Sequence, residues 1–130
     1  MAAISAQAAV ELAAQLDLDV DEVGICHACL SVVSFPLRAG DERETRRATN
    51  EFAPILWDEG LEAPVRKALE RARAAGVADA DAAARDIEAR GGRSITVKAI
   101  VRRLAADLWE RSQGNLLQMG FKPWPPADWN

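Results

Sequence analysis

The sequence predicts an all-α protein, a single-domain bundle of five or six helices followed by an extended Pro/Trp-rich C-terminal arm. Three observations predict this class: alanine is very abundant, β-branched residues are sparse outside two short stretches, and apolar residues recur at three- and four-residue spacing. The 130 residues, 49% hydrophobic and 28% charged, are enough to bury one core. We place the helical domain at residues 1–121 and the arm at 122–130.

The first predicted helix carries an apolar stripe with a four-residue period, formed by Ile4, Ala8, Leu12 and Leu16. Asp19 or Asp21 is expected to cap a second helix, which ends near Phe35 because Pro36 stops it. This second helix is apolar nearly all round, so we expect it at the centre of the domain. A buried strand is the competing interpretation of residues 29–35, because periodicity cannot separate the two in a short apolar run.

A third helix is expected to begin near Glu42, and the polar residues 43–50 place its body on the surface. Pro54 should kink or restart this helix, and Gly60 should close the unit. The next helix has Pro64 in its first turn and ends at Gly76. Its predicted inner face consists of Val65, Leu69 and Ala72.

A short helix capped by Asp79 or Asp81 is expected to run to Arg90, where two glycines follow. Ser94 or Thr96 then caps a long last helix. The apolar seam of this helix has coiled-coil spacing and consists of Val97, Val101, Leu104 and Leu108.

The C-terminal arm has three prolines and two tryptophans within residues 122–129, a composition that favours an extended polyproline conformation. Tryptophans on such an arm are stabilised by burial. The arm either folds back over its own helices or lies in the groove of a partner. Trp124, Trp129 and Phe121 are therefore the candidate interface residues.

Both cysteines and the single histidine lie together, at Cys26, His27 and Cys29. Three readings are open: two buried structural cysteines, a thiol-redox pair, or part of a metal site. Tetrahedral zinc needs four ligands, so zinc or an iron–sulfur cluster would require ligands from a second chain. We expect no cofactor, because the surrounding run is apolar and buried cysteines commonly act as small hydrophobes.

Residues 83–104 contain a short helix, a glycine turn and a helix opened by Ser or Thr, the order of a helix-turn-helix. This stretch is loosely similar to the N-terminal DNA-binding regions of plasmid regulators. The similarity implies nucleic-acid contacts from Arg93, Lys98, Arg102 and Arg103. The other reading is a plain helical hairpin with basic surface residues, which we favour because this geometry is a common packing solution.

Charge and targeting signals narrow the function. The net charge is −4, with five acidic and no basic residues in 1–37, and six basic against two acidic residues in 85–103. A phosphate-backbone partner is disfavoured by the acidic balance, no apolar run spans a bilayer, and no secretory signal is visible, so a cytoplasmic protein is expected. No catalytic set is apparent. The leading expectation is a non-enzymatic accessory protein, acting through protein contacts as a homo-oligomer or as a subunit of a larger assembly.

Overall fold

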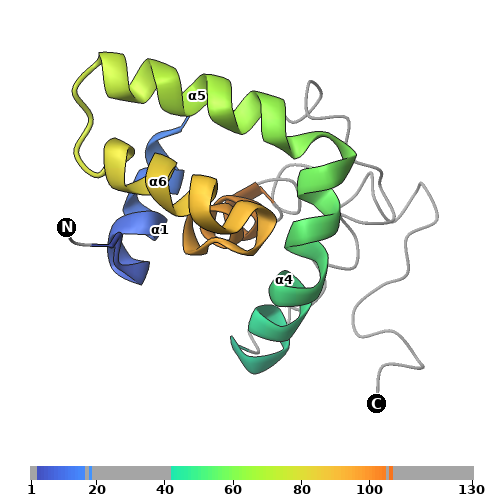
Figure 1. Cartoon of the computed structure of the whole chain (residues 1–130). Coiled ribbons are helices and arrows are strands. Elements are labelled where there is room, and N and C mark those ends of the chain that lie inside the picture. Colours follow the sequence, from blue (N-terminus) through green and yellow to red (C-terminus); the bar gives the residue numbers. More distant parts are fainter. Residues whose placement is uncertain (1–2, 17, 19–41, 105, 107–130) are drawn as a thin grey trace.

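The computed structural model describes residues 3–16, 18, 42–104 and 106, and within these ranges the chain is helical, without a strand (Figure 1). The predicted all-α class is therefore confirmed. The predicted second helix, the Cys26–Cys29 cluster, Leu108 and the arm with Phe121, Trp124 and Trp129 lie outside the described residues. The helices are α1 (Ala6–Gln15), α4 (Glu42–Leu56), α5 (Glu62–Ala74), α6 (Ala80–Arg90) and a last helix that includes residues 95–104.

Helix α1 begins at a serine cap. The Ser5 hydroxyl oxygen accepts a hydrogen bond from the backbone N–H of Ala8 at 3.1 Å, which satisfies one of the donors that a helix N-terminus leaves open. The predicted stripe faces the core, because Ile4 and Leu12 are buried and Ala8 and Leu16 pack against the same cluster.

Helix α4 passes through Pro54 and continues into a wider, π-helical turn, Trp57–Leu61, before α5 begins. The chain bends at Gly60, whose φ of 152° lies in a region that suits glycine, so Gly60 redirects the helix and does not simply end it. The polar body of α4 is only partly on the surface. Arg46 and Arg47 are exposed as predicted, whereas Thr49 is 2% exposed and belongs to the buried side.

Helices α5 and α6 form an antiparallel hairpin (Figure 1). At the end of α5, Val77 N–H donates to the Ala72 carbonyl and Gly76 N–H donates to the Arg73 carbonyl, the two bonds of a Schellman cap. Gly76 has a φ of 73°, which explains glycine at this position. Asp79 occupies the cap position of α6, but with a left-handed φ of 69° its side chain makes no capping bond.

The last helix is held by two side chains at its start. The Ser94 hydroxyl accepts from the Val97 N–H at 2.9 Å, so Ser94 is the cap. The carboxylate of Asp86, on α6, accepts from both the N–H and the hydroxyl of Thr96, at 3.1 and 3.0 Å. Thr96 is fully buried. These bonds fix residues 95–104 relative to α6.

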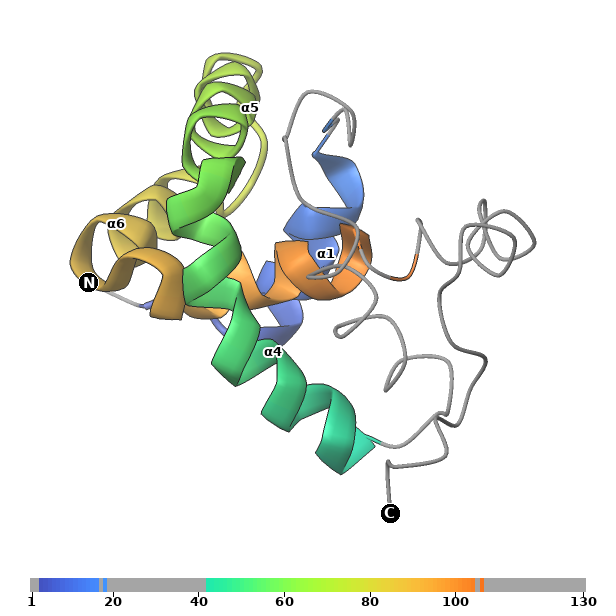
Figure 2. The ribbon, with the colours of Figure 1, turned by 90° about the vertical axis from the view of Figure 1, so that its right-hand side faces the viewer.

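Residues 95–104 run through the middle of the described fold, beside α1 and behind α4 (Figure 2). Their predicted seam is buried, with Val97, Val101 and Leu104 no more than 5% exposed. The last helix also buries Ile100, and the other elements add core side chains that include Leu12, Leu56, Leu61, Val65, Leu69 and Ile87. In the part of the chain that the structure describes, none of the helices has the length and apolar character needed to cross a bilayer.

Candidate functional site

A groove of about 260 Å³ opens where α1, α4 and the last helix meet. Each helix contributes outward-facing residues that its packing leaves uncovered. The last helix buries Val97, Ile100 and Val101, so the positions between them turn toward the groove. The lining comprises Ala6 and Val10 from α1, Arg46, Thr49 and Asn50 from α4, and Ile95, Lys98, Ala99 and Arg102 from the last helix.

Most of the exposed surface that lines the groove is apolar. Val10 is 55% exposed, and it is one of two large hydrophobic side chains that are exposed among the described residues. Ile95 and Ala99, one turn apart on the last helix, extend this apolar surface and are half-buried. Two helices therefore contribute apolar side chains to the same groove. Covering these side chains is favourable by about 25 cal/mol per Å² of apolar surface.

The edges of the groove are cationic. Arg46 comes from α4, and Lys98 and Arg102 lie one turn apart on the last helix. No Asp or Glu is found among the described residues that line the groove. The groove thus combines apolar surface with positive charge, an arrangement suited to an amphipathic surface that carries carboxylates.

Comparison of the chain with protein-family models, curated proteins and solved structures gave no match. The interpretation of the groove therefore depends on its own geometry and charge.

The four basic residues that the sequence suggested as nucleic-acid contacts lie in three different parts of the structure. Lys98 and Arg102 meet in the groove. Arg103 is turned toward α1, where it lines a small pocket with Ala13 and Leu16. Arg93 is exposed in the short turn Gly91–Arg93. The other candidates, Cys26, His27, Cys29, Phe121, Trp124 and Trp129, lie outside the described residues.

Sequence reasoning missed Val10 and Arg46. The local sequence pattern does not distinguish Val10 as a surface residue, because an apolar residue in an alanine-rich helix is expected to be buried in the core. Arg46 stands among several charged residues of α4 and has no distinguishing spacing. Only the packing of three helices, distant in sequence, brings these side chains to the same groove.

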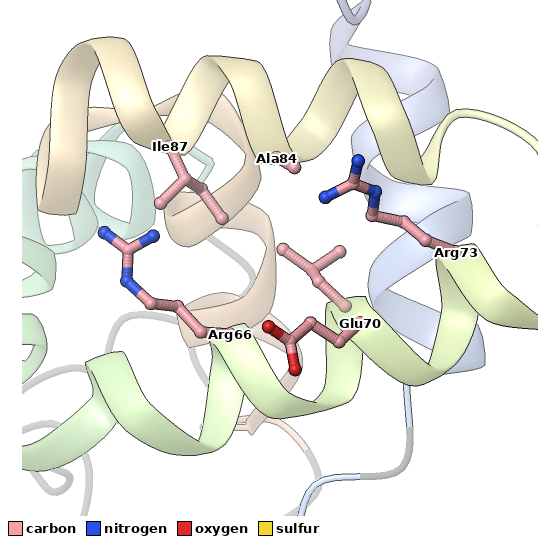
Figure 3. A pocket seen from close by; sticks show the side chains of 6 residues that line it. Arg66, Glu70, Arg73, Ala84 and Ile87 are labelled. Carbon is pink, nitrogen blue, oxygen red and sulfur yellow. The ribbon is translucent and has the colours of Figure 1, made fainter.

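A second, smaller cleft of about 100 Å³ lies between α5 and α6 (Figure 3). Arg66 and Arg73 project from α5 toward α6, on which Ala84 and Ile87 line the cleft, and Glu70 lies along α5. Both guanidinium groups already have carboxylate partners, because Arg66 contacts Glu62 at 3.1 Å and Arg73 contacts Asp81 at 2.8 Å. We interpret this cleft as part of the hairpin contact.

Arg66 also joins α5 to the bend that precedes it. Its guanidinium carbon lies 5.6 Å from the ring centroid of Trp57, within cation–π range. This contact, together with the exposed Arg66–Glu62 pair, contributes about 1 kcal/mol at most to the bend, because half-exposed charges are screened by water.

Metal binding has no support in the described ranges, where no three His, Cys, Asp or Glu side chains are grouped closely enough to hold an ion. The zinc or iron–sulfur reading of Cys26 and Cys29 concerns residues outside these ranges and stays a prediction.

Proposed function

We propose that the protein is a small helical interaction module whose groove between α1, α4 and the last helix binds another protein surface. The observation that carries this proposal is Val10, 55% exposed in a groove that is also lined by Arg46, Lys98 and Arg102. Apolar surface that is exposed and rimmed by polar groups is typical of interaction sites. The groove is bounded by helices, a surface on which the apolar face of a partner helix can lie.

This function can be tested by site-specific photocrosslinking in the cells that produce the protein. Asn50 is exposed and lines the groove, so a photoreactive phenylalanine analogue at position 50 should give protein adducts. Lys67, exposed on α5 and not among the groove residues, is the control position. Lys98→Glu in the same chain should reduce the adducts from position 50 several-fold, because it reverses a charge at the groove edge. Equal labelling from both positions, or adducts insensitive to Lys98→Glu, would contradict the proposal.

Nucleic-acid binding is the second candidate, favoured by the α6–turn–helix arrangement and by Lys98 and Arg102 on one face. A recognition helix enters the major groove of DNA with its reading face protruding. The open face of the last helix is instead flanked by α1 and α4. A groove of this shape suits a protein better than a duplex.

We therefore expect no salt-sensitive binding to duplex DNA. The measurement is fluorescence anisotropy with a labelled random duplex at low and moderate salt. Binding through phosphates would weaken steeply with salt, with a slope of about −0.9 per neutralised phosphate, and would fall on replacing Arg102 and Arg103 by Glu. Submicromolar binding with that behaviour would replace protein contact by nucleic-acid binding as the proposed function.

The finer sequence expectations belong to the same proposal. The complete chain would contain five or six helices and a C-terminal arm whose Trp124 and Trp129 add to an interface. It would act in the cytoplasm, where Cys26 and Cys29 are reduced. The apolar composition of residues 23–35 and of the arm supports the further buried helix and the interface.

A further inference from the structure

We propose that the groove binds a second copy of this chain, and that the part of the copy that docks is the ridge formed by Glu51, Ile55, Asp58 and Glu59. This inference rests on the proposed function, because it assumes that the groove is a protein-binding surface, and it names the partner.

The ridge is the second place where the described residues expose a large hydrophobic side chain. Ile55 is 44% exposed, although its neighbours Leu56 and Trp57 are buried. Ile55 lies on the outer side of α4, near the bend that leads into α5. An apolar side chain is thus exposed near the end of α4, where a groove on another molecule could cover it.

Acidic residues surround Ile55. Glu51 lies one turn before it, and Asp58 and Glu59 lie one turn after it; all three are exposed. Both surfaces therefore combine apolar and charged side chains, but the charges are opposite: carboxylates lie around Ile55 on the ridge, and cations line the groove. Burying Ile55 against Val10 would bring together the two exposed large hydrophobic side chains of the described residues.

The charge balance of the chain supports the same pairing. The described residues that line the groove include three Lys or Arg and no Asp or Glu, whereas the whole chain holds 16 Lys and Arg and 20 Asp and Glu. The remaining chain is consequently more acidic than the net charge of −4 indicates. A second copy therefore offers the groove a surface of opposite charge. Such complementarity speeds the association of the two molecules and fixes their relative orientation.

The two surfaces lie on different sides of α4, and this determines the kind of assembly. Arg46 faces the groove, and Ile55 follows nine residues later, which is a rotation of about 180° around a helix. A groove and a ridge on opposite sides of one helix cannot both be buried in a single two-fold contact. The contact is therefore head-to-tail, and each added copy leaves one groove and one ridge available.

This geometry allows a complementation experiment with the full chain. Val10→Gln places a polar side chain in the groove, and Ile55→Gln does the same on the ridge. Both positions are exposed and glutamine favours helix, so both variants should fold. Ala74→Gln, at an exposed position at the end of α5, is the matched control. Sedimentation velocity from about 1 µM to about 1 mM covers the range of weak self-association.

We expect the mass of the wild-type chain and of Ala74→Gln to rise with concentration beyond that of a dimer, and to fall back as salt is added. Each glutamine variant alone should associate at least about tenfold more weakly. An equimolar mixture should form a 1:1 dimer and stop there, because the intact groove of one variant accepts the intact ridge of the other.

Two outcomes would overturn this inference. If the wild-type chain associates but the mixed variants stay monomeric, the contact is not groove to ridge. If the wild-type chain is a monomer throughout, a second copy is not the partner. In that second case crosslinking from position 50 still decides whether a different protein occupies the groove, so the proposed function and the partner fail separately.

Discussion

Gly92→Val should lower the free energy of unfolding by about 3 kcal/mol, at the upper end of the cost of overpacking a core. A Cβ atom at position 92 would lie 2.6 Å from the Cα of Pro54 and 2.9 Å from the Cβ of Trp57. Both atoms are at or next to the backbone of a helix, so neither can move aside as the tip of a flexible side chain would. Gly92 is buried, and the turn Gly91–Arg93 contacts α4 through this close approach.

Gly76→Ala is the matched control. Gly76 has a φ of 73°, but a Cβ there would meet nothing within 4 Å. The cost is then backbone strain alone, about 1–2 kcal/mol. Urea unfolding followed by circular dichroism measures both variants. Equal losses of stability at the two positions would show that the contact between the turn and α4 is looser than described.

Asp86→Ala should lower the free energy of unfolding by about 2–3 kcal/mol. The carboxylate of Asp86 accepts from both the N–H and the hydroxyl of Thr96, and Thr96 is fully buried. Removing the acceptor leaves a buried donor pair without its partner, and bonds to charged groups are among the stronger ones. Because these two bonds join α6 to the last helix, the variant should also loosen one wall of the groove.

Asp81→Ala on the same helix separates this effect from a general loss of charge. Asp81 is exposed and forms an ion pair with the exposed Arg73, so its removal should change stability by less than about 0.5 kcal/mol. When Asp86→Ala is combined with Thr96→Val, the loss of unfolding free energy should be smaller than the sum of the losses in the two single variants, since fewer polar groups remain unpaired. Strict additivity would contradict the assigned hydrogen bonds.

Local signals predicted most of the described helices. Ser94, one of the two predicted caps, does begin the last helix, and glycine at position 76 marked the end of α5, because caps are chemical features of a few adjacent residues. The four-residue stripe of α1 likewise identified its buried side. The bend at Gly60 was predicted only as an end, because sequence shows that a glycine interrupts a helix but not that the chain continues beyond it.

The candidate site was predicted only in part. Lys98 and Arg102 were identified because they are basic residues in the later helix of the helix-turn-helix pattern. Arg103 was grouped with them, yet it lies about 100° further round the helix, toward α1. Val10 and Arg46 could not be assigned, because they become neighbours of Lys98 only through tertiary packing.

The groove and the acidic ridge are the two surfaces through which we propose that the protein binds a second copy of itself. The most direct measurement is a dilution series of amide correlation spectra from the isotope-labelled chain. We expect the signals of Val10, Asn50, Ala99, Ile55 and Asp58 to shift together with concentration, while those of Glu88 and Ala89, exposed on α6, stay in place. Concentration-dependent shifts confined to α6, or spectra that do not change at any concentration, would contradict the proposed self-association through these two surfaces.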